Sequence, residues 1–109
     1  MQNDRMPDIV IDIGVCTRFT INLSGVDFTG IEKIIFTVKN DTETDSPVII
    51  EREFTESGSH AVIIAPEESV RLKNGAEYDL NKLLVDGTRH KMTNNGSIVL
   101  RRGVGGCLG

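Results

Sequence analysis

The chain has 109 residues and a mass of 12.0 kDa, which fits one domain with a single hydrophobic core. Only 5% of the residues are aromatic and none is Trp, so the core must be built mainly from aliphatic side chains. The net charge of -4 argues against nucleic acid as a partner, because phosphate binding needs a cationic surface. No apolar run approaches the roughly 18 residues of a membrane span.

The first half of the chain predicts strands. Residues 18–23 alternate strictly, with Phe19, Ile21 and Leu23 on one face, which is typical of a half-buried strand. In one run, Ile34, Phe36 and Val38 share a face that we expect to point inward. Another run begins with Pro47, which suits an edge strand because proline cannot donate to a central ladder. The expected strands cover residues 9–13, 18–23, 31–40 and 47–54.

The second half adds one short helical segment to further strands. Pro66 and the two glutamates after it favour a first helical turn. Asp86 and Gly87 predict a two-residue hairpin of type I′, and the sequence NNG at residues 94–96 indicates a bulge or kink. The expected strands are residues 61–65, 76–85, 88–93 and 97–102, and the helical turn lies within residues 66–72.

About seven or eight short strands, separated by turns and without a long helix, predict an all-β antiparallel sandwich. A small barrel remains the competing architecture. Residues 1–101 are expected to form the single domain, and residues 102–109 a flexible Gly-rich tail. Cys16 and Cys107 lie near opposite ends of the chain and could form a disulfide, but we expect free thiols, which are more common in cytosolic chains.

Tyr78, the only tyrosine, follows Leu72 and Gly75 at an informative spacing. In immunoglobulin-like sandwiches a tyrosine near the start of the sixth strand packs its ring inside and donates to main chain a few residues upstream. The side chain of Leu72 would then pack into the core, and Gly75 would permit the turn. The alternative is a tyrosine on the sheet surface with no special role. The segment resembles the corresponding corner of fibronectin type III domains, which makes an immunoglobulin-like sandwich of seven to eight strands the expected fold.

Further segments resemble small immunoglobulin-like domains of phage tails and baseplates, among them the N-terminal domain of the phage baseplate upper protein. In chain order they are IVIDIGVCTRFTINL, DFTGIEKIIFTVKN, VIIAPEESVRLKNGAEYDL and LVDGTRHKMTNNGSIVLRRG. The likeness covers roughly residues 8–101. The chain departs from the pattern at Cys16, where an acidic residue is expected, in the long acidic loop 40–46, and at an extra residue in NKLLV.

The resemblance implies a non-enzymatic structural or assembly module of a bacteriophage or prophage virion, associated with the tail or baseplate. Such a module acts through protein–protein packing, with other virion proteins or further copies of itself as partners. The implied location is the virion, assembled in the bacterial host cytoplasm, with neither nucleic acid nor membrane as a partner. The alternative is a cell-surface or secreted immunoglobulin-like module for binding or adhesion, which recognises carbohydrate or protein through its loops.

No set of residues in the sequence indicates catalysis, a cofactor or a metal site. His60 and His90 are expected to be solvated on the surface, and no histidine stands near Cys16 in sequence. The acidic loop 40–46 lacks the glycine and the closing glutamate of a calcium-binding loop, so we expect a solvated hairpin loop. A small hydrolase would require Cys16, His60, His90 and Asp86 to come together in the fold.

One surface is predicted to favour association. If Phe36 and Ile64 point inward, the alternation directs Ile35, Ile49 and Ile63 outward. Several isoleucines on an outer sheet face would form an apolar patch of the kind that marks an interface. The alternative is a bulge that shifts the phase by one residue and buries these side chains instead.

Overall fold

The computed structural model, which describes residues 6–41, 46–93 and 95–102, is mostly β. Each predicted strand is present, with ends within two residues of the prediction. No helix in the described ranges is both long and apolar enough to cross a membrane. The elements are β1 (Ile9–Ile13), β2 (Thr17–Asn22), β3 (Ile31–Lys39), β4 (Val48–Phe54), β5 (Ser59–Ile64), α1 (Pro66–Ser69), β6 (Glu77–Leu84), β7 (Arg89–Lys91) and β8 (Gly96–Arg102).

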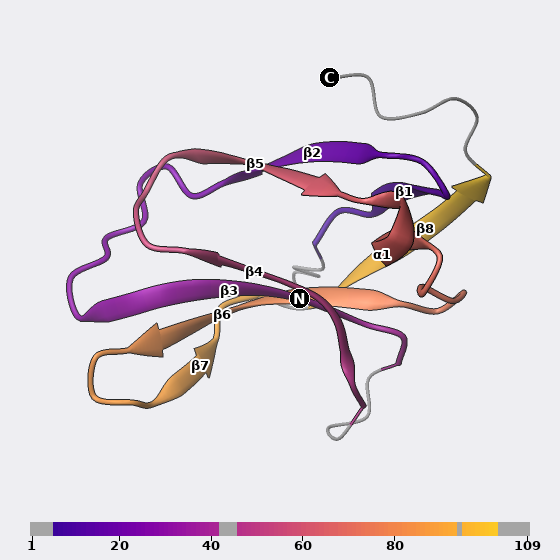
Figure 1. The fold of residues 1–109 in the computed structure, drawn as a ribbon. Coiled ribbons are helices and arrows are strands. Elements are labelled where there is room, and N and C mark those ends of the chain that lie inside the picture. Colours follow the sequence, from indigo (N-terminus) through magenta and orange to yellow (C-terminus); the bar gives the residue numbers. More distant parts are fainter. Residues whose placement is uncertain (1–5, 42–45, 94, 103–109) are drawn as a thin grey trace, which may run out of the picture.

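The strands form two sheets of unequal size (Figure 1). The larger has the order β1-β8-β6-β3-β4, with β7 paired to β6, and it curls into a half-barrel. The smaller contains β2 and β5, which run above β3 and β4 in Figure 1. Because β1 and β8 are parallel, the larger sheet is mixed, and the prediction of a purely antiparallel fold is wrong. The rest of the domain separates these two strands in sequence, so no tight hairpin imposes antiparallel pairing on them.

The core lies between the two sheets and is centred on β3. Ile34, Phe36 and Val38 are fully buried, so the predicted inward face of this strand is confirmed. The ring of Phe19 on β2 lies 5.8 Å from that of Phe36, measured between centroids, and so joins the small sheet to the large one. On the other side, the ring of Tyr78 on β6 lies 5.5 Å from Phe36. Three aromatic rings from three strands therefore connect the two layers.

Tyr78 is buried as predicted, but its hydroxyl has an unexpected acceptor. The hydroxyl donates to the carbonyl oxygen of Pro7 at 2.5 Å. Because a phenol donates one hydrogen bond, the expected acceptor a few residues upstream is wrong. The bond ties β6 to the segment that leads into β1. The other parts of the corner are confirmed, since Leu72 is buried in the core and Gly75 has a positive φ of 96°.

The hairpin between β6 and β7 is not the predicted type I′ turn. Gly87 N donates to Leu84 O at 2.9 Å, and Leu84 N donates to Thr88 O at 2.8 Å. Gly87 has a φ of 92°, whereas no residue other than glycine in the described ranges has a positive φ, so Asp86 is not left-handed. A type I turn followed by a left-handed glycine is the three-residue hairpin with a G1 bulge.

Three sequence-based predictions fall partly outside the described residues. The acidic loop contains residues 42–45, the predicted bulge contains residue 94, and the predicted tail contains residues 103–109, all of which lie outside the described ranges. Arg102, which belongs both to the expected strand 97–102 and to the start of the expected tail, is the last residue of β8. Gly96 opens the same strand.

The three isoleucines expected on the outer face do not form a patch. Ile35 lies between Glu53 and Asn81 on the neighbouring strands and is only 4% exposed. Ile49 falls at a register shift between β3 and β4 and packs against the core, so the alternative of a phase slip is confirmed for this residue. Only Ile63, at 51%, is well exposed.

Candidate functional site

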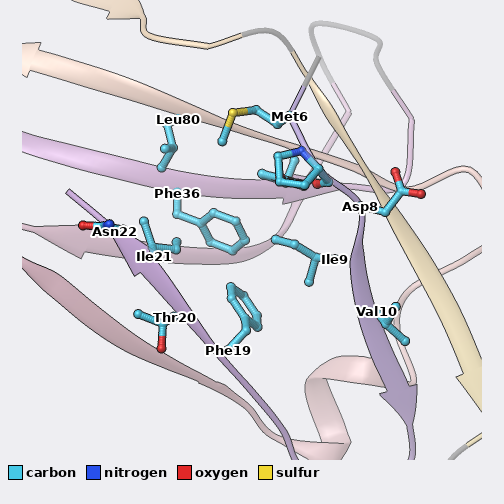
Figure 2. Close-up of a pocket in the computed structure, with 12 residues that line it drawn as sticks. Met6, Asp8, Ile9, Val10, Phe19, Thr20, Ile21, Asn22, Phe36 and Leu80 are labelled. Carbon is cyan, nitrogen blue, oxygen red and sulfur yellow. Dashed lines mark hydrogen bonds between the residues drawn. The ribbon is translucent and has the colours of Figure 1, made fainter. Parts of the chain in front are cut away.

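A cavity of about 440 Å³ lies between β1 and β2 and is the candidate site (Figure 2). This volume falls within the range of pockets that bind ligands or inserted side chains. The segment before β1 and the strands β1, β2, β3 and β6 all contribute to its walls. We call the space between the two strands the β1–β2 groove. The side chains that point into it in Figure 2 include Ile9, Phe19, Ile21, Phe36 and Leu80.

The apolar floor of the groove follows from strand alternation. On β2, Phe19 and Ile21 point toward the core, whereas Thr20 points away from it in Figure 2. Phe36 on β3 and Leu80 on β6 belong to the large sheet and close the bottom of the groove. Five apolar side chains from both sheets thus meet at one place without filling it.

One wall of the groove is a strand edge with unpaired main chain. Leu23 N donates to Gly58 O at 2.8 Å, which fixes the phase of the ladder between β2 and β5. Main-chain groups alternate between the two sides of an antiparallel strand. The N–H and C=O groups of Arg18, Thr20 and Asn22 therefore face away from β5. No described strand pairs with this edge of β2.

The opposite wall is the outer edge of β1. Asp12 N donates to Thr17 Oγ1 at 2.8 Å and so faces away from β8. By the same alternation, the main-chain groups of Val10 also face away from β8, on the side of the cavity that Val10 lines. The two edges meet at the bond between Asp12 and Thr17, beside the turn of residues 14–16. Beyond that bond the cavity lies between them (Figure 2).

The other edge of the small sheet is blocked. Arg52 on β4 donates from Nη2 to the carbonyl oxygen of Ile63 on β5 at 3.0 Å. The same guanidinium binds both carboxylate oxygens of Glu68 at 2.7 and 3.0 Å. Burial raises the pKa of Glu68, but hydrogen bonds from Arg52 and from the Ala65 N–H outweigh it, and the pKa lies below its usual value. A bonded charge pair thus covers the β5 edge at Ile63, while the β2 edge stays open.

The rim of the groove carries negative charge. Asp8 is the charged side chain among the lining residues, and in Figure 2 its carboxylate points outward, away from the aromatic rings. Asp12, on the same strand, is paired with Arg101 at 2.7 Å, and the hydrogen bond from Arg101 lowers the pKa of Asp12. A partner that follows β1 would therefore meet the carboxylate of Asp8 at the mouth of the groove.

The histidines and Asp86 lie away from this groove. His60 on β5 is half-buried and bonds through Nε2 to Glu56 O at 2.7 Å, so the expectation of a fully solvated His60 is only partly met. His90 on β7 is exposed, as expected. Asp86 lies in the hairpin before β7, where hydrogen bonds from Thr88 hold the pKa of Asp86 below its usual value.

Cys16 is not joined to these residues in a catalytic arrangement. It precedes Thr17, which pairs with Ile64, whereas His60 pairs with Ile21 four residues further along β2. That separation is roughly 14 Å along the strand. Cys16 is disulfide-bonded, so the expectation of a free thiol is wrong there, and Cys107 lies outside the described residues. In the ranges 6–41, 46–93 and 95–102, no three His, Cys, Asp or Glu side chains are grouped to hold a metal ion.

The sequence pattern indicated the floor of the groove but not its open edge. The alternation in residues 18–23 predicted that Phe19 and Ile21 face the core, and both pack against it. Which edge of β2 lacks a neighbour depends on pairing between distant segments, and no local signal reports this. Comparisons with known proteins add no assignment: no protein-family model matches the chain, and no curated protein matches it either.

Proposed function

We propose that the chain is a non-enzymatic structural module of a bacteriophage or prophage virion, associated with the tail or baseplate, that acts by packing against other proteins. The sequence segments that resemble phage tail and baseplate domains support the location. The open edge of β2 beside an apolar groove supports the mode of action, and it is the observation that carries the proposal. Unpaired main chain next to apolar side chains is a surface for another polypeptide, as in strand addition.

We also propose that the fold is immunoglobulin-like. In such domains one sheet contains strands G, F and C, extended by C′ in variable-type domains, and the other contains B and E. If β2, β3, β4, β5, β6 and β8 are taken as B, C, C′, E, F and G, the observed orders β8-β6-β3-β4 and β2-β5 agree with this arrangement. The buried Tyr78 at the second position of β6 supports the same assignment.

Rigidity is the physical property that such a module contributes to an assembly. The core joins both sheets, and the bond from Tyr78 to Pro7 ties the start of β1 to β6. Arg52 and Glu68 tie β4 to α1, so the segment between the two sheets is held as well. A body held in this way presents its strand edges in a fixed geometry, which lowers the entropic cost of association.

The proposal is tested on virus particles from the bacterium that carries the gene. Particles are induced, purified by density gradient, analysed by quantitative mass spectrometry and labelled with antibodies against this chain. We expect a fixed ratio of this chain to the major tail protein across gradient fractions, with gold label at the tail or baseplate. An abundant host protein measured in the same fractions serves as the control for contamination. A chain that labels intact bacteria and is missing from the particles would favour the surface-binding alternative.

A further inference from the structure

We propose that an extended segment of a neighbouring virion subunit adds to the open edge of β2 as a third strand and fills the β1–β2 groove with its apolar side chains. This inference deepens the proposed function, on which it rests for the source of the segment. The strand-addition mode itself rests on the geometry of the two edges and of the floor between them.

The main chain of β2 is open along the groove. The N–H and C=O groups of Arg18, Thr20 and Asn22 face the groove side and have no strand partner in the described ranges. A sheet of two strands is the smallest possible and is marginal by itself, whereas a third strand increases both pairing and burial. An extended segment satisfies these groups in register, which a compact ligand does not do.

The floor of the groove suits the apolar side chains of an added strand. Phe19, Ile21, Phe36 and Leu80 leave a cavity of about 440 Å³ beneath the open edge. In a strand laid along β2, every second side chain would point down into this cavity, and the others would point to solvent. The geometry therefore specifies an alternating sequence, with medium-sized apolar residues at the inward positions.

The two edges of the small sheet differ in how open they are to an added strand. The corresponding edge of β5 is covered at Ile63 by the guanidinium of Arg52, which is itself held by Glu68. A strand that approached β5 would have to displace this bonded pair, so addition is directed to β2. At the mouth of the groove, the carboxylate of Asp8 favours a segment with a basic residue at that end.

The experiment uses the full chain and a defined probe, an acetylated nonapeptide of alternating Val and Thr that ends in Lys. Binding is measured by calorimetry, and amide hydrogen exchange is followed by NMR. We expect exchange at Arg18, Thr20 and Asn22 to slow by roughly tenfold or more in the complex, while amides that already face β5 change little. A control peptide has the same sequence but carries methyl groups on the backbone nitrogens that would face β2. It is expected to bind about tenfold more weakly, because it loses several main-chain hydrogen bonds.

A matched pair of variants tests the edge from the protein side. Thr20→Pro removes an N–H that faces the groove, and Ala61→Pro removes one at the directly paired position, which faces the other edge of the same sheet. Both residues are exposed. We expect Thr20→Pro to weaken the peptide about tenfold and Ala61→Pro to change its affinity by less than about twofold. If Thr20→Pro does not fold, the N-methylated peptide makes the same test on the parent protein.

Several outcomes overturn the inference. One is the absence of peptide binding at millimolar concentration, and another is protection of amides away from β2. The amide of Thr20 could exchange slowly in the free chain and lose this protection when residues 1–5 are removed. That result would mean that the protein's own N-terminal residues occupy the edge of β2. If the chain forms a dimer without peptide, and Thr20→Pro converts this dimer to a monomer, a second copy of the chain occupies the edge of β2. These results leave the virion assignment intact, whereas absence from particles removes that assignment and leaves the peptide result standing.

Discussion

Replacement of Gly96 by alanine is expected to displace the buried ring of Tyr78 from its position in the core. Gly96 pairs directly with Tyr78 across β8 and β6. A Cβ atom at position 96 would lie 2.3 Å from Cε2, 2.4 Å from Cζ and 2.7 Å from the hydroxyl oxygen of Tyr78. The ring cannot swing aside freely, because it packs against Phe36 and its hydroxyl is bonded to Pro7.

The magnitude follows from three effects. Overpacking of a core by one methyl group costs about 1–3 kcal/mol. Displacement of the phenol loses the hydrogen bond to Pro7, which contributes about 1 kcal/mol. Restriction of the unfolded chain by alanine offsets about 0.4–1 kcal/mol of this. We therefore expect Gly96→Ala to lower the free energy of unfolding by about 1–3 kcal/mol, in spite of the general advantage of alanine over glycine in a strand.

Urea denaturation followed by circular dichroism measures the loss, and tyrosine fluorescence reports on the ring itself, because the chain has one Tyr and no Trp. The specific control is a double-mutant cycle. On a Tyr78→Leu background, Gly96→Ala should cost at least about 1 kcal/mol less than in the parent. Gly25→Ala, where φ is positive and no atom lies within 4 Å of the added Cβ, should cost the same on both backgrounds. An unchanged stability and fluorescence in Gly96→Ala would refute the close contact.

Four further substitutions test other parts of the structure. Ser69→Ala should cost about 1–3 kcal/mol in urea denaturation, because the fully buried hydroxyl joins α1 to the turn after β1. Ile35→Lys should cost more than about 2 kcal/mol, since it places a charge at a site with 4% exposure, whereas Ile63→Lys should stay within about 0.5 kcal/mol. Glu68 has a pKa below its ordinary value of 4.5, so its stabilising effect is complete above that pH and is lost as the pH falls through the folded pKa. The stability difference between the parent and Glu68→Gln should therefore shrink below about pH 4.

Each of these measurements has a contradicting outcome. Equal costs for the two isoleucine substitutions would mean that Ile35 is not buried. A difference between the parent and Glu68→Gln that stays constant from pH 7 to pH 3 would mean that the carboxylate is not held by Arg52. A neutral Ser69→Ala would mean that solvent replaces the hydroxyl at the N–H of Gly14, to which it is bonded at 2.9 Å.

Local pattern was sufficient for the strands and for most of the core. The alternation around Phe36 predicted one buried face of β3, and Gly75 was expected to permit a turn, because both effects depend on neighbouring residues alone. The burial of Tyr78 was predicted from its spacing to Leu72 and Gly75, which resembles the tyrosine corner of immunoglobulin-like sandwiches. Its acceptor was missed, because Pro7 lies 71 residues away in sequence and only the pairing of distant strands brings it close.

The predicted apolar patch is not present, for two different physical reasons. Ile49 lies at a register shift, where an extra residue in β4 interrupts the alternation and Ile49 packs against the core. Ile35 keeps the predicted direction but belongs to a central strand, where neighbours on both sides cover an outward side chain. The open edge of β2 was missed because it is defined by the absence of a neighbour, which no run of residues encodes.

The outer face of the large sheet explains why docking should occur at an edge. Beside the buried Thr37 on β3 stand Glu51 on β4 and Asp79 on β6, at directly paired positions. A protein that covered this face would have to remove both carboxylates from water, which costs several kcal/mol for each charge that is left unpaired. An incoming strand at β2 has no such cost, because its own main chain supplies a donor or acceptor for each group that it covers. The same arrangement of charges that keeps the broad face solvated therefore leaves the narrow edge, with its apolar floor, as the surface on which a partner gains the most free energy.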